Sequence, residues 1–339
     1  MQAAVYDRPR QLRLAEVPDP MPGPGEVRLR ARVTGVCGTD VHLHDGEFFP
    51  VYPLIPGHEV VGEVDMVSEG AEGVEVGQLV VLDNMLTCGL CDKCRRGRPN
   101  FCRHLRALGV TDPGGFAEYL VAPAAKCYPV DDLALDTAVL AEPVACAIHG
   151  LDVLAMRPGS DVLVVGAGPS GLILTQLLRS SGAGRLIVAA PTEAKLDLAR
   201  HFGADSTVRL GRDDPDAGVT ALAEMAPDGF DVVIDATGAL SVLERALGLV
   251  RDGGVLFVYG MAGENIRLPV SPYDVFRREL TIKGSFAQCF SFDRAVLALR
   301  GGRVRSDGLI THRFPLASYP QAVETVRSDR ACVKAVVQL

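Results

Sequence analysis

The stretch that decides the fold of this chain is DVLVVGAGPSG, from Asp161 to Gly171, followed by LILTQLLRS and then by RLIVAA at 185–190. A short apolar run before a glycine-rich turn predicts a buried strand, and the longer segment after the turn predicts a helix. The next apolar run predicts a second strand. A strand, a helix and a strand in this order are typical of a parallel sheet covered by helices.

The three glycines of this turn are Gly166, Gly168 and Gly171, with Pro169 and Ser170 between the last two. The first glycine permits a tight turn, the second lets the backbone approach a pyrophosphate, and the third lets the helix pack closely. The N-terminus of the helix attracts the anion. An ordinary glycine-rich turn can carry the same letters, but the flanking strands and helix favour a dinucleotide-binding site formed by these five residues.

Three more apolar runs continue the pattern, FDVVIDAT at 230–237, GGVLFVYG at 253–260 and LTIKGSF at 280–286. The helical segments VTALAEMA and SVLERALGLV precede the first and the second of these runs. We therefore predict an α/β domain with a doubly wound parallel sheet, the Rossmann fold, over residues 147–287.

The first 140 residues have a different texture, with short strand-like runs such as EVRLRARV at 26–33 and EVVGEVDMV at 59–67. At 339 residues the chain is longer than one hydrophobic core usually fills. The ending CVKAVVQL predicts a strand that returns to this first domain. We therefore predict a mainly β domain over residues 1–146 and 288–339.

The loop TCGLCDKCRRGRPNFC holds four of the nine cysteines, Cys88, Cys91, Cys94 and Cys102. Four thiolates at this spacing can surround Zn²⁺ and leave no position open for a substrate. Iron–sulfur ligation is an alternative, because C-x2-C-x2-C also opens ferredoxin motifs, but no proline follows Cys102. Four unrelated buried cysteines would rarely fall so close together. We predict a structural zinc lobe over residues 85–104.

Composition excludes some classes of partner. With 34 Lys and Arg against 42 Asp and Glu, the net charge of −8 disfavours nucleic-acid binding. The start MQAAVYDRPR lacks the segments of a signal peptide, and no apolar run of about 18 residues predicts a membrane span. We expect a cytoplasmic protein with reduced cysteines and with neither a nucleic-acid nor a membrane partner.

A second group of metal-binding residue types lies in TGVCGTDVHLHDG and PGHEVVGEV, and it includes Cys37, His58 and Glu59. A catalytic zinc takes three such protein ligands and leaves one position open. Sequence spacing alone does not pair Cys37 with His58, because a lone cysteine or histidine is more often a packing or surface residue.

Taken together, the motifs make the chain resemble the zinc-containing medium-chain alcohol and polyol dehydrogenases, including the sorbitol and threonine dehydrogenases. The resemblance covers essentially the whole length and rests on GVCGTDVH, PGHE, the four-cysteine loop, GGFAEY, EPVACAIHG, GAGPSG, DATG and THRFPL, which occur in the family's order. It implies a GroES-like first domain, a homodimer or homotetramer, and hydride transfer between an alcohol and a nicotinamide cofactor.

The resemblance also implies a catalytic zinc bound by Cys37 and His58, with Glu59 beside the metal or exchanging as a ligand. Glu142 falls where polyol and threonine dehydrogenases carry a ligand carboxylate, so it is a predicted ligand too. Cys146, four residues later, is expected to be a small buried residue.

Two further roles come from the same resemblance. Thr39 and His42 would form a proton relay with the cofactor ribose, and Phe116 would line the substrate pocket. Sorbitol dehydrogenases carry an arginine and a tyrosine shortly after the IKG segment, where this chain has Ala287 and Gln288. The specific substrate is therefore left open.

We accordingly predict a zinc-dependent oxidoreductase that transfers a hydride between a secondary alcohol, in the class of polyols or sugar alcohols, and a nicotinamide cofactor. A threonine-type amino-alcohol dehydrogenase is the first alternative. A nucleotide-binding family member without catalysis is the second, and the retention of Cys37, His58, Glu59 and Glu142 together argues against it.

The choice of cofactor depends on the end of the second strand of the dinucleotide-binding unit. Relatives that use NAD carry an acidic residue there, which binds the ribose and repels a 2′-phosphate, but this chain has Ala190. Thr192, Lys195 or Arg200 can supply hydrogen bonds or charge to a phosphate, whereas Glu193 can reach the ribose instead. We expect a modest preference for NADP, or the use of both cofactors.

Overall fold

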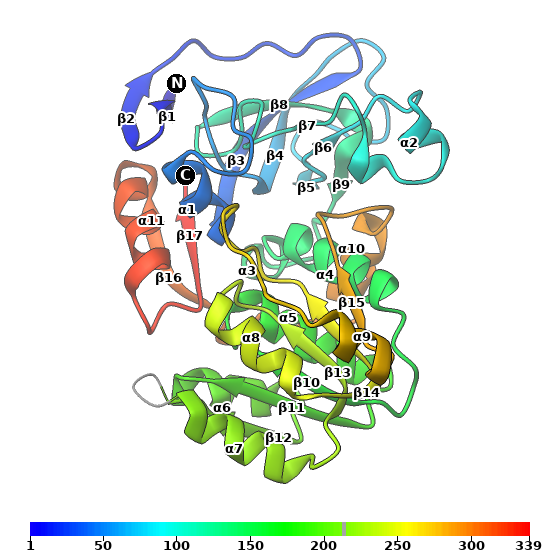
Figure 1. Cartoon of the computed structure of the whole chain (residues 1–339). Coiled ribbons are helices and arrows are strands. Elements are labelled where there is room, and N and C mark those ends of the chain that lie inside the picture. Colours follow the sequence, from blue (N-terminus) through cyan, green and yellow to red (C-terminus); the bar gives the residue numbers. More distant parts are fainter. Residues whose placement is uncertain (212–214) are drawn as a thin grey trace. The chain divides into compact units, whose positions relative to one another are not determined.

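The computed structural model describes residues 1–211 and 215–339, and these form two compact units (Figure 1). The first unit comprises Met1–Cys146 and Ala287–Leu339, and the second comprises Ala147–Phe286. The chain first passes from one unit to the other within α4 (Ala141–Leu154). It returns at Ala287, one residue before the boundary that the sequence suggested.

The second unit contains a six-stranded sheet in the order β12-β11-β10-β13-β14-β15, and every neighbouring pair is parallel. Because β11 and β13 flank β10, the strand order changes direction there, which is where ligands of such sheets bind. The elements of this unit are β10 (Asp161–Val165), α5 (Pro169–Ser180), β11 (Arg185–Ala190), α6 (Glu193–His201), β12 (Ser206–Arg209), α7 (Pro215–Met225), β13 (Phe230–Asp235), α8 (Leu240–Gly248), β14 (Val250–Val258), α9 (Pro272–Arg278) and β15 (Thr281–Gly284).

The central strands of this sheet are apolar along their whole length because both faces are covered. Val162, Leu163 and Val164 of β10 have no exposed surface, and Leu186–Ala189 of β11 are equally buried. This is the pattern of a parallel sheet rather than of a half-exposed strand. The predicted doubly wound domain is therefore present. The one notable shift is β14, which begins at Val250, three residues before the predicted run.

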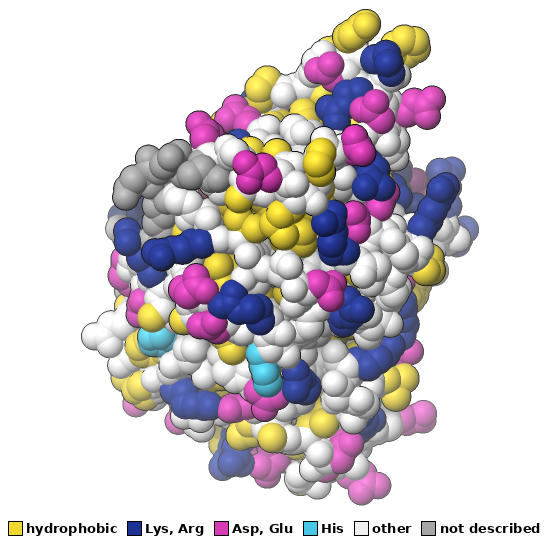
Figure 2. Space-filling view, turned by 90° about the horizontal axis from the view of Figure 1, so that it is seen from below, with side chains coloured by type: hydrophobic (Ala, Val, Ile, Leu, Met, Phe, Trp, Pro, Cys, Tyr) yellow, Lys and Arg dark blue, Asp and Glu magenta, His cyan; other side chains and the backbone are white. Residues whose placement is uncertain are grey.

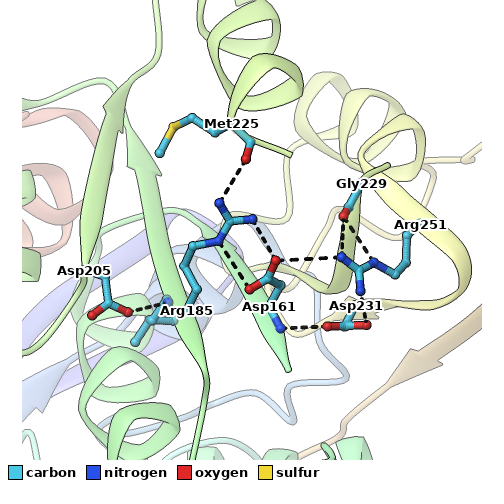
Figure 3. A network of polar contacts seen from close by, with 8 residues as sticks. Asp161, Arg185, Asp205, Met225, Gly229, Asp231 and Arg251 are labelled. Atoms are coloured by element: carbon cyan, nitrogen blue, oxygen red, sulfur yellow. Dashed lines mark hydrogen bonds and ion pairs between the residues drawn. The ribbon is translucent and has the colours of Figure 1, made fainter. Parts of the chain in front are cut away.

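A network of charges joins the amino-terminal ends of four parallel strands (Figure 3). Asp161 lies opposite Arg185 in the β10–β11 register, and the guanidinium donates to both carboxylate oxygens at 3.2 and 2.7 Å. Arg251 of β14 donates to Asp231 at 2.8 Å and lies 3.7 Å from the same Asp161 carboxylate. Asp231 in turn accepts the Asp161 backbone N–H at 2.7 Å. These contacts fix the register at this edge and leave the carboxyl-terminal edge for a ligand.

The first unit is built mainly from antiparallel strands. Its seven-stranded sheet has the order β16-β17-β3-β4-β5-β9, and β8 also pairs with β3. As predicted, the terminal strand returns to this unit, where β17 pairs with β3. The strands are β1 (Gln2–Arg8), β2 (Gln11–Glu16), β3 (Glu26–Val36), β4 (Glu59–Val67), β5 (Leu79–Leu82), β6 (Met85–Leu86), β7 (Arg106–Ala107), β8 (Tyr119–Pro123), β9 (Cys127–Pro129), β16 (Ile310–Pro315) and β17 (Lys334–Gln338).

The helices of the first unit are short and lie between or after these strands. Two of them contain predicted metal ligands, because α1 follows Cys37 and α4 carries Glu142. The helices other than α4 are α1 (Gly38–Asp45), α2 (Asp92–Arg95), α3 (Leu135–Ala138), α10 (Phe292–Arg300) and α11 (Tyr319–Ser328), with 3₁₀ turns at Pro99–Phe101, Ala124–Lys126 and Leu316–Ser318.

One helical stretch, Leu135–Leu154, is long and apolar enough to cross a membrane by length and composition. The stretch is not an unbroken apolar run, because Asp136, Glu142 and Asp152 interrupt it. Of its most apolar 18 residues, 61% are buried inside the protein, as in the core helix of a folded domain. On the face shown in Figure 2, acidic and basic side chains are interspersed, with hydrophobic side chains grouped among them.

Candidate functional site

The four cysteines of the predicted lobe converge on one point. Cys91 Sγ lies 3.7 Å from Cys94 Sγ and 3.9 Å from Cys102 Sγ, and Cys88 Sγ lies 3.5 Å from Cys102 Sγ. Four sulfurs bound to zinc at about 2.3 Å form a tetrahedron with edges of about 3.8 Å. The sulfurs already have the spacing of a closed zinc site, so these residues fit the metal.

The electrostatics of the lobe also favour a cation. Backbone N–H groups, those of Cys94 and Arg103 first, lower the pKa of Cys91 to about 6. Burial, followed by the sulfurs of Cys102 and Cys91, raises the pKa of Cys94 to about 12. One thiolate therefore forms readily while its neighbour resists ionisation, and a divalent cation among the four sulfurs would stabilise all of them as thiolates.

A second cluster forms where β3 and β4 pair. Glu59 begins β4 and lies opposite Gly35 of β3, while Cys37 follows β3 at the start of α1. The ligand atoms of Cys37, His58 and Glu59 all lie within 4.8 Å of one another. A Cβ at position 35 would stand 1.8 Å from the Glu59 carboxylate, so only glycine leaves room for that side chain. The antiparallel register thus brings together residues that sequence spacing could not pair.

Lys334 of β17 completes this cluster, and the sequence analysis missed it. Its ammonium group forms an ion pair with Glu59 Oε2, and each of the two side chains is 1% exposed. Lys334 Nζ also donates to the carbonyl of Val36 at 3.3 Å. Among the described residues, Glu59 Oε1 has no hydrogen-bond partner. A buried carboxylate oxygen without a donor suits a metal ligand. The sequence did contain one indication of Lys334, because a lysine inside the otherwise apolar run CVKAVVQL is unusual unless it has a buried partner.

Asp40 is the second residue without a predicted role. It is fully buried on α1, accepts the Cys37 backbone N–H at 2.8 Å, and lies 3.9 Å from His58 Nδ1. Burial raises the pKa of Asp40 to about 6. Burial acts to lower the pKa of His58, but the neighbouring Cys37 and Asp40 raise it to about 10. Acidic groups thus surround the histidine. Asp40 could have been recognised from the sequence as a helix-capping residue, because it lies three residues after Cys37 at the start of α1.

Glu142 lies on the first turn of α4, outside the set of three ligand atoms. Its Oε1 accepts a hydrogen bond from the Cys146 thiol one helical turn later, at 3.2 Å. Burial raises its pKa, His58 lowers it and Glu59 raises it, which places the carboxylate in the electrostatic range of the cluster. Cys146, predicted to be a small buried residue, thus also has a polar partner.

The predicted relay residues share one face of α1, three positions apart. The Thr39 hydroxyl lies 3.7 Å from Cys37 Sγ, so it is adjacent to the candidate metal site. His42 Nδ1 lies 2.6 Å from a carboxylate oxygen of Glu47. Glu47 carried no predicted role.

Phe116 does not have the expected position. Its side chain has no exposed surface and lies in the core of the first unit, where its ring faces Tyr319 with centroids 4.1 Å apart. A ring enclosed in this way offers no surface to a substrate, so the predicted pocket-lining role is not supported.

Gln288 stands near the place where sorbitol dehydrogenases carry substrate-binding residues, but here it is 5% exposed. Its amide donates to Asp83 at 2.9 Å and to Asn84 at 3.1 Å. The side chain is thus used inside the first unit. This agrees with leaving the specific substrate open.

The predicted dinucleotide turn joins β10 to α5. Gly166 has a φ of 113°, Gly168 is the N-cap of α5, and Pro169 and Ser170 begin the helix. A Cβ on Gly171 would stand 1.9 Å from the Gly166 carbonyl oxygen, so helix and strand are as close as the predicted role of the third glycine requires. The N-terminus of α5 faces this turn, where a pyrophosphate can accept its N–H groups.

The end of β11 carries the residues considered for cofactor choice. Ala190 is the last residue of β11, and Glu193 and Lys195 lie on the first turn of α6. Arg200 forms an ion pair with Glu193 at 2.7 Å and also contacts Asp197. Both Glu193 and Arg200 are thus engaged with each other.

A neighbouring strand adds a residue that the sequence analysis missed. Arg209 of β12 is exposed and lies directly opposite Ala190 in the parallel register. Side chains at paired positions point to the same face of a sheet. The pairing register of β12 with β11 could not be predicted from the sequence, so nothing there indicated that Arg209 lies beside Ala190.

Two known protein families match separate parts of the chain. Residues 23–132 match the family described as the alcohol dehydrogenase GroES-like domain, and residues 169–299 match the family described as zinc-binding dehydrogenase. The chain is 43% identical over 339 residues to D-arabinitol dehydrogenase 1 of Uromyces fabae, covering 100% of this chain and 97% of that protein. It is 34% identical to D-altritol 5-dehydrogenase of Agrobacterium fabrum, covering 95% and 94%.

Two solved structures are similar over 100% of this chain and 99% of their own. One is a zinc-binding dehydrogenase of Sinorhizobium meliloti 1021 bound to NADP, with a TM-score of 0.93 and 31% identity. The other is a short chain alcohol dehydrogenase of E. coli CFT073 in complex with NADH, with a TM-score of 0.90 and 30% identity.

The lobe geometry predicts the effect of removing one sulfur. Cys91→Ser should lower the zinc content by about one ion per chain and reduce thermal stability, because a closed metal site contributes directly to folding. Cys127→Ser, a buried cysteine outside the lobe, is the control for the loss of a thiol and should keep its zinc. Atomic absorption and thermal unfolding give the two readouts. A folded Cys91→Ser protein with unchanged metal content would contradict the assignment.

Proposed function

Because this chain belongs to the zinc-binding alcohol dehydrogenase family, we propose that it oxidises a secondary hydroxyl group of a polyol or sugar alcohol with a nicotinamide cofactor. The observation that carries the proposal is the cluster of Cys37, His58 and Glu59, which can hold zinc with a position left open. Two relatives, at 43% and 34% identity, are named for D-arabinitol and D-altritol, both of which are polyols.

Each residue of the cluster has a role in this reaction. When bound, zinc would act as a Lewis acid toward the substrate hydroxyl group, and the nicotinamide would accept the hydride. Cys37 and His58 would hold the metal, and Asp40 Oδ1 lies 3.9 Å from His58 Nδ1, so its charge acts on the ring without a direct hydrogen bond. Thr39 takes the hydroxyl proton beside the metal site, and His42 passes it toward solvent.

Two carboxylates compete for the third ligand position. Glu59 lies within 4.8 Å of both other ligand atoms, whereas Glu142 is occupied by the thiol of Cys146. Glu59 is therefore the better-placed ligand, and Glu142 is the carboxylate that can exchange with it. This reverses the order that the family resemblance implied.

The chemistry of the cofactor turn supports a nicotinamide dinucleotide, and we propose a modest preference for NADP, or the use of both cofactors. Ala190 removes the carboxylate that would repel a 2′-phosphate. Arg209 stands opposite Ala190 on β12, and side chains at paired positions point to the same face of the sheet. Arg200 is less suited, because Glu193 and Asp197 already accept from it.

The exposed edge of the second unit supports a homodimer. Strand β15 ends the sheet and pairs only with β14 in the part of the chain described. Ile282 on this strand is 42% exposed, and Tyr273 and Phe276 of α9 are 69% and 81% exposed. An exposed edge strand is a template for pairing, and a two-fold axis would join two copies of β15 in one continuous sheet.

The metal cluster predicts where activity is lost. The zinc-loaded protein should oxidise D-arabinitol or D-altritol with a kcat/KM at least about tenfold above that for L-threonine, a difference of about 1.4 kcal/mol. Cys37→Ser and His58→Ala should reduce turnover to the level without enzyme, yet leave cofactor binding intact. Absorbance of the reduced cofactor and fluorescence titration measure the two properties.

Metal retention tests the order of the carboxylates in the same assay. Glu59→Gln should weaken zinc binding more than Glu142→Gln does. Turnover by metal-stripped protein would refute the mechanism, and a preference for L-threonine would favour the amino-alcohol alternative.

The cofactor proposal predicts that two different substitutions each reduce the use of NADP. Ala190→Asp should lower kcat/KM for NADP about tenfold, because the new carboxylate repels the 2′-phosphate, while NAD is affected little or favoured. Arg209→Gln should also reduce the use of NADP. Arg179→Gln, which removes an exposed arginine paired with Asp205, is the matched control. A wild-type protein that strongly prefers NAD, unchanged by the aspartate, would contradict the proposal.

The edge strand predicts the oligomeric state. Light scattering coupled to size exclusion should give twice the chain mass of 36.0 kDa for the wild type, or four times in a tetramer. Ile282→Lys should reduce the assembly because it places a charge at the paired edge. Val76→Lys changes an exposed valine of the first unit and should leave the mass unchanged. A monomeric wild type would overturn the proposal.

A further inference from the structure

Helix α1 ends in a turn that places Glu47 beside His42. Gly46 has a left-handed φ of 87°, its N–H donates to the Leu43 carbonyl at 3.1 Å, and the Glu47 N–H donates to the His42 carbonyl at 2.9 Å. These two hydrogen bonds define a Schellman motif, the usual end of a helix at a glycine. The motif folds the chain back over the last turn of α1, so the backbone of Glu47 contacts the backbone of His42.

The side chains meet at the same place. Glu47 Oε2 lies 2.6 Å from His42 Nδ1, and the two side chains are 37% and 23% exposed. An ionised carboxylate can only accept hydrogen bonds, so the proton of a neutral imidazole must be on Nδ1. The lone pair of His42 is then on Nε2. This is the nitrogen that is free to accept a proton from another group.

The other charged side chains near this helix end do not form ion pairs with Glu47. The neighbouring carboxylate, Asp45, accepts from Arg10 and Arg327, each at 3.0 Å. In the described part of the chain, the ion pairs of Glu47 involve only His42. The negative charge of Glu47 is thus available to stabilise a positive charge on the imidazole ring.

We propose that Glu47 is a positioning residue that holds His42 in the Nδ1–H tautomer and so makes Nε2 the atom that accepts the proton. The inference rests on the proposed relay through Thr39. In that relay Thr39 Oγ1 takes the hydroxyl proton and gives up its own, His42 Nε2 accepts a proton at the other end of the relay, and the resulting imidazolium, stabilised by Glu47, releases a proton to solvent. Carboxylates that orient a histidine in this way fix both its tautomer and its ring.

The alternative is that the Glu47 side chain only completes the helix end. The capping contact, however, is made by the backbone N–H of Glu47, which every substitution except proline keeps. The side chain contributes only the contact with His42. Glu47→Gln therefore leaves the cap in place and removes the obligate acceptor, since an amide can either accept from Nδ1–H or donate to a bare Nδ1.

The first test is spectroscopic and needs no substrate. In protein labelled with ¹⁵N at histidine, the His42 signals are assigned by their loss in His42→Gln, and the shifts of its nitrogens report the tautomer above the pKa of the ring. The wild type should have the proton on Nδ1, and Glu47→Gln should shift the population toward Nε2–H. A wild-type His42 with its proton on Nε2, or a tautomer unchanged by Glu47→Gln, would overturn the proposal.

The second test is a double-mutant cycle in the zinc-loaded enzyme. Glu47→Gln should lower kcat about tenfold with little change in the KM for the alcohol, because it acts on proton transfer rather than on binding. In a His42→Ala background the same substitution should have no further effect. Asp45→Asn removes a carboxylate from the same helix end without touching His42, and should leave kcat unchanged.

The outcomes of the two tests separate the proposals. Independent, multiplicative effects of Glu47→Gln and His42→Ala on kcat would overturn the positioning role. An enzyme without turnover toward any alcohol would refute the proposed function, and the tautomer of His42 would still decide the role of Glu47. Thermal unfolding of each variant shows whether the fold is kept.

Discussion

The buried ion pair between Glu59 and Lys334 is the interaction on which the first unit depends. It joins the start of β4 to the last strand of the chain, across β3, and both side chains are almost fully enclosed. A buried charge that loses its partner costs about 3–5 kcal/mol, so each of the two residues fixes the other in place. Gly35 makes the pair possible, because any side chain there would occupy the position of the Glu59 carboxylate.

The same pair organises the candidate metal site. Lys334 carries one positive charge into a region where Cys37, Asp40, Glu59 and Glu142 can carry negative ones. This is too little compensation if all of them ionise. Burial raises the pKa values of Asp40 and Glu142, and the nearby Glu59 carboxylate raises both further. A divalent cation resolves it. The protein thus holds its acidic groups close together for a ligand that the fold itself does not supply.

The second unit solves a different physical problem, the binding of a dinucleotide. Its central strands are apolar along their length, so the polar contacts collect at the two edges of the sheet that hold the strand ends. At the amino-terminal edge, Asp161, Arg185, Asp231 and Arg251 bind one another and fix the strands. At the carboxyl-terminal edge the glycines leave backbone N–H groups open to an anion. Asp235, the buried last residue of β13, accepts hydrogen bonds from the backbone N–H groups of Thr237 and Gly238 at this edge.

The sequence by itself determined the two folds, the four-cysteine lobe and the glycine turn, because each depends on residues close together in the chain. Spacing defines a zinc knuckle or a tight turn before any tertiary contact forms. Tertiary structure decided the rest. Strand register brought Lys334 to Glu59 and Arg209 to Ala190, and core packing enclosed Phe116 and Gln288. The pairing of strands that are distant in the sequence leaves no local sequence pattern, so these contacts could not be predicted from residues close together in the chain.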